Sequence, residues 1–560
     1  MNQARRSHLL PSARTSIAQT PRDLLADLNH STNVRLPYHP RLAHRHQYGK
    51  NLYVFAPPPL LLFEDFMGAP ASMKSLLALP IVAALAISSG CSLTLDLDQC
   101  TSDTDCAGDQ ICSADGLCAA PGEDQGRQLT GGPCQRLEGD TEHDDPFLMG
   151  VVLQLSGSGA GFGTPMLESI LLATNNINGF GGIAGRPIGL VVCDTAGSNA
   201  TARQAAEHLV DNAEVSAIIG FNSSQTISIS QDITVPNDVL IMSPSATAQT
   251  ISGLADNDLV FRTAPNDEFQ AEAFAELLSH TLETTLPDAG ITEPKLAIMV
   301  RRDDSYAEGL SETIIPMLPT AITSGGEDRF TVDNYTNSGV GEPVDYTGDV
   351  AAVASQSTPP DVVAIFGSAE AWELISYFEI ALENQPLYFG VDAMKNAQLA
   401  GQADPSLEGR IWGTGPRNVG DAGYQPYLNF RLQFEPLLGE NPDKYQFVAN
   451  AFDAVYALAF AAAAEGFTGP ELAQGLRRLS QGPEITPRAA EAQQAVNTLL
   501  EGGSVTYLGA SGPMFFDENG DPQPTPISLW CFQDASVPEE GEIYSESREF
   551  TPLTCSEPEG

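Results

Sequence analysis

The sequence predicts an α/β protein with two doubly wound parallel-sheet lobes, preceded by a small disulfide-rich module. From Phe147 onward, short apolar runs alternate with stretches whose apolar residues recur at helical spacing, the pattern of right-handed strand-helix-strand crossovers. This alternation occurs twice along the chain, which predicts two lobes. Ahead of the first lobe, four cysteines recur at a constant spacing of six, which indicates the cross-linked module.

The first predicted lobe consists of strands that alternate with helices. The strand candidates are FLMGVVLQL, IGLVVC, VSAIIG and DVLIM, and the helix candidates between them are PMLESILLATNNI, TARQAAEHLVDNA and TISISQDITV. The second helix candidate places one set of apolar residues on a single face: Ala202, Ala205, Ala206, Leu209 and Val210. Because helices separate the strands, the sheet is expected to be parallel.

The second lobe repeats the pattern. Its strand candidates are KLAIMV, RFTVDNY, DVVAIF and PLYFG, and the stretch EAWELISYFEIAL is a predicted helix with Trp372, Ile375, Phe378 and Leu382 on one face. Open parallel sheets bind ligands beyond the carboxyl ends of their strands. The binding site is therefore expected at those ends.

Small and hydroxylated residues follow three strands of the first lobe, in SGSGAGFGTP, GFNSSQT and SPSATA. Hydroxyls and free backbone N–H groups that converge at a sheet edge can hold an anion such as a carboxylate. Taken singly, each Ser or Thr is better explained as a helix cap, but three such ends in one lobe favour a ligand site. A dinucleotide-binding loop is disfavoured, because Phe162 and Thr164 occupy positions where the GxGxxG pattern needs glycine.

Residues 1–72 differ from the rest of the chain. They carry eight Lys and Arg against four Asp and Glu and show no sustained period, so we expect a mis-annotated leader that does not fold. Met73 begins MKSLLALPIVAALAISSGC, which has the layout of a secretory signal peptide over residues 73–90. SSGC resembles a bacterial lipobox, so Cys91 is expected to be lipidated on the periplasmic side of a bacterial membrane. The alternative is a genuine extension with an internal membrane helix.

Eight further cysteines are disulfide candidates. Cys100, Cys106, Cys112 and Cys118 lie in an acidic stretch, residues 91–118, too poor in apolar residues to fold without cross-links. Zinc is disfavoured because the CxxC and His spacings are missing. Cys134, Cys193, Cys531 and Cys555 can pair in three ways, and the sequence does not choose among them. Residues 119–146 are polar and acidic and are predicted to be a linker.

Composition excludes several functions. A formal net charge of −45 argues against a nucleic-acid partner. After the leader only His143, His208 and His280 remain, and the sequence has no GxSxG motif, so we predict that the protein is not an enzyme.

DENGDP at 517–522 resembles a calcium loop but lacks the required Gly and Glu, which favours a turn around Asn519 and Gly520. We predict no cofactor and no metal.

A run of motifs resembles the family of periplasmic leucine/isoleucine/valine-binding proteins, the substrate-binding components of ABC transporters with the type I fold. GFGTPMLESILLATNNINGFGGIAGRPIGLVVCDT resembles the opening of that family, and further motifs follow in the family's order: AIIGFNSSQT, LIMSPSATA, VFRTAPND, DDSYAEGL, PDVVAIFGSAEA, LYFGVDAMKN and GPMFFDENGDP. The resemblance covers residues 147–533. Thr195 departs from it, because a second acid is common there.

The resemblance implies two lobes joined by a three-stranded hinge. It places lobe one at residues 147–263 and 415–505 and lobe two at residues 266–412 and 506–533. Residues 534–560 are then a C-terminal extension. The lobes of this fold close on a ligand by a hinge motion.

The resemblance also implies a set of ligand-binding residues. On lobe one, Ser223 or Ser224, Ser245 and Thr247 would hold the carboxylate and amine of an amino acid, with Phe162 beside them and Ala246 in the same segment. On lobe two, Tyr306 and Ser368 would face the cleft, and Asp392 matches the acid that pairs with the ligand's ammonium. The alternative for Asp392 is a helix-capping acid.

These observations favour a lipid-anchored solute-binding protein that closes on a small amino acid or a related zwitterion or amide for ABC-type import. Its expected partners are this ligand, the membrane through the lipid and an ABC permease. The alternative is a ligand-sensing receptor domain that uses the same two lobes without transport.

Overall fold

The computed structural model describes residues 111–112, 118–119, 127–302, 304–326, 329–337, 344–417 and 423–555. The predictions for the leader, the signal peptide, Cys91, Cys100 and Cys106 lie outside these residues. In the predicted Cys-rich module, β1 (Ile111–Cys112) pairs with β2 (Cys118–Ala119) in antiparallel register. The cross-links predicted there remain predictions.

The first main sheet has the strand order β3-β5-β4-β6-β7-β8. Its central strands are continuous apolar runs buried on both faces, as parallel strands covered by helices require, and all of its pairs are parallel except β3–β5. The strands are β3 (Cys134–Gly139), β4 (Phe147–Leu153), β5 (Ile188–Asp194), β6 (Ala217–Gly220), β7 (Leu240–Ser243) and β8 (Val260–Arg262).

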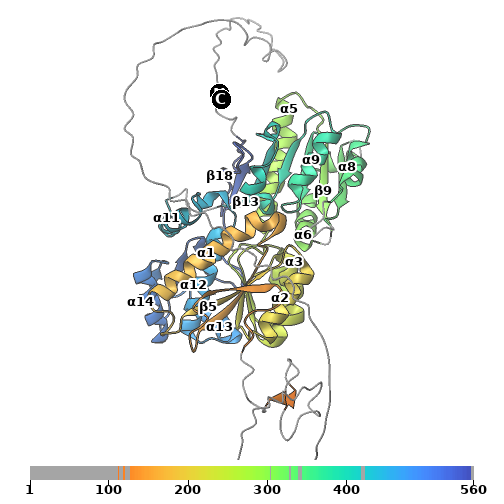
Figure 1. Cartoon of the computed structure of the whole chain (residues 1–560). Helices are drawn as coiled ribbons and strands as arrows, with labels where there is room; N and C mark the ends of the chain where they lie inside the picture. The colour runs from red at the N-terminus through yellow and green to blue at the C-terminus, as the bar shows by residue number, and fades with distance from the viewer. Residues whose placement is uncertain are drawn as a thin grey trace, which may run out of the picture. The chain divides into compact units, whose positions relative to one another are not determined.

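Helices cover both faces of this sheet. One face packs in the larger core on α1 (Ala160–Gly179), α11 (Gln425–Leu438), α12 (Val448–Ala464), α13 (Gly469–Leu476) and α14 (Ala489–Leu500). The opposite face packs on α2 (Asn199–Asp211) and α3 (Ser223–Ile229). Figure 1 shows α1 and α12 side by side, although the two helices belong to opposite halves of the chain.

 

The second main sheet has the strand order β10-β9-β11-β12-β13-β17-β18. Its first five strands are parallel, and β17 and β18 extend the sheet with antiparallel pairs. The strands are β9 (Leu296–Arg301), β10 (Phe330–Tyr335), β11 (Val362–Phe366), β12 (Leu387–Gly390), β13 (Ile411–Pro416), β17 (Ile527–Cys531) and β18 (Glu539–Tyr544). Two mixed, mainly parallel sheets confirm the predicted α/β class.

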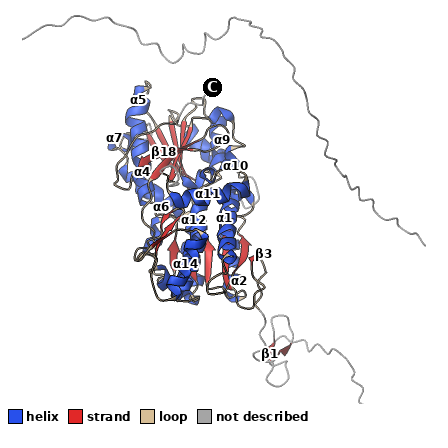
Figure 2. Cartoon of the chain, turned by 90° about the vertical axis from the view of Figure 1, so that its left-hand side faces the viewer, coloured by secondary structure: helices blue, strands red, loops and turns tan. Residues whose placement is uncertain are grey.

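The helices of the second lobe surround this sheet, and Figure 2 shows strands enclosed by helices. They are α4 (Glu268–His280), α5 (Leu286–Asp288), α6 (Ser305–Ile314), α7 (Thr320–Thr323), α8 (Thr347–Ala354), α9 (Ala371–Ala381) and α10 (Ala397–Ala400). Their apolar faces and the sheet form one buried core. The predicted helix over EAWELISYFEIAL is α9, whose Trp372, Ile375 and Phe378 are buried as expected.

Within the described residues, the chain passes between the two cores three times. The passages run from β8 to α4, from β13 to α11, and from β16 (Gly512–Pro513) to β17. The segment before β16 differs from the expected division, because β15 (Thr506–Gly509) pairs with β14 (Glu484–Ile485), and Tyr507 and Met514 lie in the first core. The expected start of the last lobe-two segment at residue 506 is therefore wrong, because this segment packs in lobe one as far as Met514.

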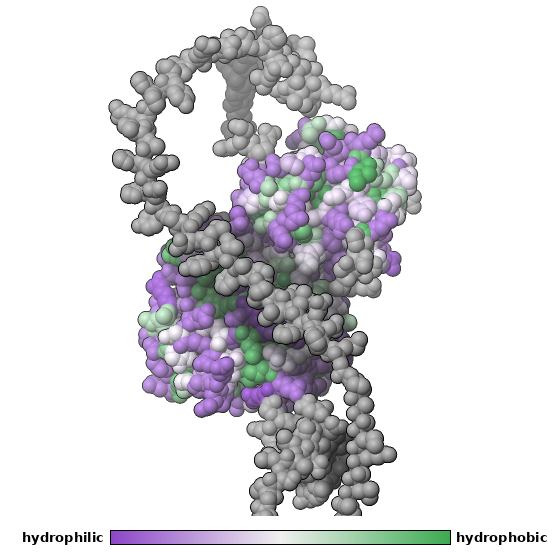
Figure 3. All heavy atoms as spheres, in the orientation of Figure 1, coloured by the Kyte–Doolittle hydropathy of each residue, from purple (hydrophilic) through white to green (hydrophobic). Residues whose placement is uncertain are grey.

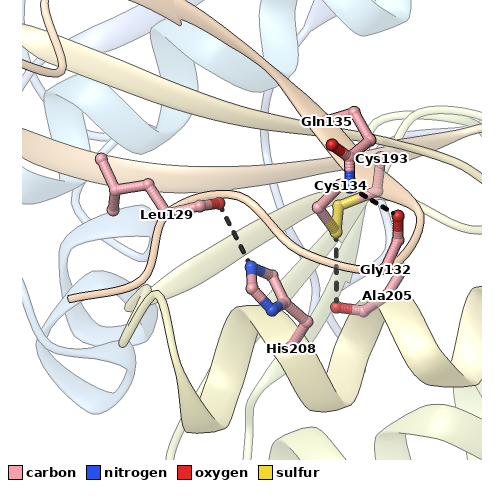
Figure 4. Close-up of a disulfide and its surroundings, with 7 residues drawn as sticks. All are labelled: Leu129, Gly132, Cys134, Gln135, Cys193, Ala205 and His208. Carbon is pink, nitrogen blue, oxygen red and sulfur yellow. Dashed lines mark hydrogen bonds between the residues drawn. A yellow bond between two sulfur atoms is a disulfide. The ribbon is translucent and has the colours of Figure 1, made fainter. Parts of the chain in front are cut away.

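The linker prediction for residues 119–146 is wrong for β3. This strand forms the antiparallel edge of the first sheet beside β5 and is fixed there by a disulfide between Cys134 and Cys193. Its residues Gln135 and Arg136 are polar and exposed, as an edge strand permits. Figure 4 shows the disulfide beside His208, whose Nε2 lies 3.2 Å from the Leu129 carbonyl oxygen.

The second disulfide joins Cys531 to Cys555, so the structure selects one of the three pairings that the sequence left open. The predicted C-terminal extension therefore contributes β18 to the second sheet and is cross-linked back to β17. In Figure 1 this dark blue strand lies at the edge of the second sheet.

In the described part of the chain, no single helix is long and apolar enough to cross a membrane. Helices α12 and α13 pass that test only as a pair bent by 100°. The apolar length of α12 has another explanation, since nearly all its residues are buried in the first core. Figure 3 shows mostly hydrophilic side chains on the visible face, with scattered apolar patches.

Candidate ligand-binding cleft

A cavity of about 120 Å³ lies between the two lobes. A water molecule needs roughly 10–15 Å³ of such volume, so this cavity holds on the order of ten non-hydrogen atoms. The lobe-one residues that line it are Val152, Leu153, Gln154, Gly159, Phe162, Met166, Thr195, Phe221, Asn222, Ser223, Gln225, Ser245, Thr247 and Phe447. The lobe-two residues are Asp304, Tyr306, Ser368, Ala369, Asp392 and Ala393.

The structure brings most of the predicted site residues to this cavity. Seven of them line it: Phe162, Ser223, Ser245, Thr247, Tyr306, Ser368 and Asp392. Two do not. Ala246 is fully buried away from the cavity, and Ser224 bonds instead to Ser305 on α6.

The order of the elements explains why these residues meet. Ser245 and Thr247 follow β7, Ser368 follows β11 and Asp392 follows β12, so each stands beyond the carboxyl end of a parallel strand. Phe162 lies in the first turn of α1 and Tyr306 in the first turn of α6. Both helices begin just after a strand, α1 after β4 of the first sheet and α6 after β9 of the second, so each first turn lies at the carboxyl end of its own sheet.

Asp392 is the centre of the polar side on lobe two. The Tyr306 hydroxyl donates to Asp392 Oδ1, and Gln270 Nε2 donates to the same oxygen at 3.0 Å. Asp392 is 1% exposed, and its burial raises the pKa of its carboxyl. It does not cap a helix through its side chain, which argues against the capping alternative.

A second buried acid, Asp267, lies behind the cleft. Burial and the nearby Asp392 charge raise its pKa well above the usual range. Its backbone N–H donates to the Thr247 carbonyl at 2.9 Å, and its side chain bonds to Thr247. Asp267 therefore joins the first passage between the lobes to a cavity-lining residue, a role that the sequence analysis did not detect.

Asp304 has a structural role as well as a place in the cavity wall. Its carboxylate caps α6 by accepting from the Tyr306 N–H at 3.1 Å, and it pairs with Arg301 at 3.4 Å. Burial raises its pKa, and Arg301 opposes that shift. Among the described lining residues, none is Lys, Arg or His, so an anionic group in this cavity must bind to neutral donors.

In the hydroxyl-rich loops of lobe one, some polar side chains fix the loops by hydrogen bonds and others line the cavity. Asn222 caps α3 by accepting from the Gln225 N–H at 2.9 Å, and Ser243 Oγ accepts from the Ala246 N–H at 3.0 Å. Ser223 Oγ accepts from the Ala248 N–H at 3.1 Å, which ties the start of α3 to the loop after β7. Ser245 and Thr247 are held at the cavity wall by this network.

The other end of the cavity is apolar. The rings of Phe162 and Phe447 meet edge to face with centroids 6.0 Å apart, and Leu153, Met166 and Phe221 complete the wall. Phe447 opens α12, about 285 residues after Phe162, and no motif in the sequence connected it with the site. A ligand with one apolar end and one charged end would match the apolar and polar sides of this cavity.

Two lobes that enclose a small amphiphilic cavity define a class of binding proteins. A model of the family described as periplasmic binding protein matches residues 147–498, and the chain belongs to that family. The family consists of substrate-binding proteins, so the prediction that the chain is not an enzyme is confirmed, and membership implies an extracytoplasmic location.

Curated relatives and solved structures agree with this membership. The chain is 25% identical to Leu/Ile/Val-binding protein homolog 3 of Brucella melitensis over 309 residues, 55% of this chain and 76% of the relative. It is 23% identical to Leu/Ile/Val-binding protein BraC3 of Rhizobium johnstonii over 391 residues, 70% of this chain and 92% of the relative.

Two crystal structures share the fold. One is a leucine-binding protein, LivK, from Thermotoga maritima, with a TM-score of 0.55, 20% identity, and coverage of 70% of this chain and 97% of that chain. The other is LivJ from Streptococcus pneumoniae in complex with isoleucine, with a TM-score of 0.55, 19% identity, and coverage of 70% and 98%.

Proposed function

We propose that this protein is the solute-binding component of an ABC-type importer and that it closes on a small amino acid with an apolar side chain. The observation that carries the proposal is the opposition of Asp392 on one lobe and the hydroxyls of Ser223, Ser245 and Thr247 on the other, in one cavity of about 120 Å³. The relatives named for leucine, isoleucine and valine support it.

Each part of such a ligand has a proposed partner in the cavity. Its ammonium pairs with Asp392, whose buried charge has no basic partner among the described lining residues. Its carboxylate accepts hydrogen bonds from Ser223, Ser245 and Thr247, and its side chain contacts Phe162 and Phe447. Each charge that leaves water is thereby met by an opposite charge or a donor, as burial requires.

Calorimetry with a panel of L-leucine, L-isoleucine, L-valine, L-alanine, an amino acid amide and urea tests this function. We expect tight binding of at least one apolar amino acid and a higher melting temperature in its presence, because a ligand that binds only the folded state stabilises it. A panel without any binder contradicts the proposal.

Transport is tested separately from binding. In proteoliposomes that contain the permease and ATPase subunits of the proposed importer, the ligand-loaded protein is expected to stimulate ATP hydrolysis. Ligand binding without stimulation would favour the sensor alternative.

Lipid attachment at Cys91 on the periplasmic side of a bacterial membrane is part of the same proposal. Mass spectrometry of the mature protein tests it, because a lipidated N-terminal Cys91 is expected and tryptic peptides from before Met73 would contradict it.

A further inference from the structure

Arg262, the last residue of β8, is fully buried and uses all of its N–H donors. Its Nε donates to Asp521 Oδ1 at 2.6 Å and its Nη2 to Asp521 Oδ2 at 2.8 Å, a two-pronged ion pair. Nη2 also donates to Ser252 Oγ at 2.8 Å. The remaining nitrogen, Nη1, is directed at the loop that follows β7.

That nitrogen holds the backbone on both sides of Thr247. Nη1 donates to the Ala246 carbonyl at 3.1 Å and to the Ala248 carbonyl at 2.9 Å. Ala246 and Ala248 are buried in a small apolar cluster, whereas Ser245 and Thr247 line the cavity. One guanidinium group therefore holds the peptide directly before Thr247 and the peptide directly after Ala248, so it restrains the backbone on both sides of the Thr247 side chain.

Asp521 belongs to the third passage between the lobes. Its Oδ2 also accepts from Ser252 Oγ at 2.6 Å, and the Arg262 N–H donates to the Gly520 carbonyl at 3.1 Å. The chain approaches β8 closely here, because a Cβ on Gly520 would lie 2.3 Å from the Val260 carbonyl oxygen. The segment after β7 and the third passage are thus joined through Asp521, which binds both Arg262 and Ser252.

We infer that Arg262 and Asp521 are positioning residues for ligand binding: without contacting the ligand, they hold Ser245 and Thr247 at the cavity and connect that loop to the passage between the lobes. This inference rests on the proposed function of the cleft. A purely structural ion pair would affect stability alone, whereas positioning residues affect the geometry of the loop and the affinity as well.

The test is Arg262→Lys. Lysine keeps the positive charge beside Asp521, but its single ammonium cannot reach the carboxylate and both carbonyls in the fixed geometry of a guanidinium. Hydrogen exchange of the ligand-free protein measures the loop directly. We expect at least tenfold faster exchange in the peptide that covers residues 243–250, and at least a tenfold higher Kd for L-leucine, or for the apolar amino acid of the panel that binds wild type.

Arg410→Lys is the matched control, because Arg410 forms a similar two-pronged pair with Glu379 on lobe two, away from the cavity. It is expected to change neither exchange at 243–250 nor the Kd. If Arg262→Lys does not fold, Asp521→Asn replaces it and is expected to act in the same direction with a smaller effect.

Unchanged exchange at 243–250 in the folded variant overturns the inference, and so does an unchanged Kd beside faster exchange. Because the exchange measurement needs no ligand, it still tests the positioning of the loop if wild type binds no compound of the panel. A wild-type protein that binds no compound of the panel would contradict the proposed function, but it would not contradict the positioning of the loop.

Discussion

Ser224 and Ser305 join the two lobes at the rim of the cleft. Their Oγ atoms lie 2.9 Å apart, and the Ser305 N–H donates to Ser224 Oγ at 3.0 Å. Ser224 lies in the first turn of α3 and Ser305 opens α6, beside the cavity-lining Ser223 and Tyr306. Since the two bonds connect different lobes, they stabilise the arrangement in which the cleft is covered.

We predict that Ser224→Ala favours the open arrangement. A typical hydrogen bond contributes about 0.5–1.5 kcal/mol, so the closed-to-open ratio is expected to fall about two- to tenfold. Small-angle scattering of the ligand-free protein should show a larger radius of gyration than wild type. Ser228→Ala is the control, because Ser228 Oγ bonds only within α3; an equal change in both variants would refute the cross-lobe role.

The charge of Asp392 is predicted to carry much of the affinity. Asp392→Asn preserves the shape but removes a charge-assisted hydrogen bond worth about 1.5–3 kcal/mol, so the Kd for the bound amino acid should rise roughly ten- to hundredfold. Calorimetry measures the change. Glu383→Gln, an exposed acid on the same lobe, should leave the Kd unaltered, and a similar loss in both variants would mean that only net charge matters.

Asp453 is predicted to make the first lobe more stable in mild acid. It is buried on α12 and accepts from the Tyr507 hydroxyl at 2.7 Å and from the Ala510 N–H at 2.8 Å, and burial raises its pKa to about 6. A raised folded-state pKa means that the folded protein binds the proton more tightly than the unfolded chain. The stabilisation is present below the unfolded pKa and is lost as the pH rises through about 6.

This group alone should make the free energy of unfolding about 2 kcal/mol larger at pH 4.5 than at pH 7.5. Urea unfolding at both pH values measures the difference for wild type and for Asp453→Asn, which lacks the titrating carboxyl. The variant should lose that part of the pH dependence, whatever its absolute stability. Identical pH dependence in the two proteins would show that Asp453 does not titrate in this range.

The two disulfides are predicted to differ in their contribution to stability. Loop-closure entropy gives about 4 kcal/mol for Cys134–Cys193 and about 3 kcal/mol for Cys531–Cys555, because the bridged residues are 59 and 24 positions apart. Denaturant unfolding of the double alanine variants measures both. A larger loss from Cys531→Ala with Cys555→Ala would contradict this order.

The fold could be predicted because strand and helix periods are local. The apolar runs at β4, β5, β6 and β7 are continuous and separated by amphipathic helices, so class and sheet type followed from the sequence. The edge strand β3 escaped prediction because its polar residues face water. Only its pairing with β5, more than fifty residues away, makes it a strand.

Site residues that directly follow a strand could be predicted, but partners distant in sequence could not. Ser223 and Ser224 are equivalent by motif, yet one reaches the cavity and the other reaches α6, a difference that depends on how the lobes pack. Likewise, Arg262 and Asp521 are 259 residues apart. Their side chains have no shared signal in the sequence, because the pairing arises only when the third passage lies against β8.

The Cys134–Cys193 bridge also determines how the first lobe responds to tension. The bond joins the first residue of β3 to β5, a strand inside the sheet. A pull on the preceding chain therefore reaches β5 through a covalent link before it can strip the hydrogen bonds of β3 one after another. The edge of the sheet is thus protected against mechanical unzipping from its amino-terminal side.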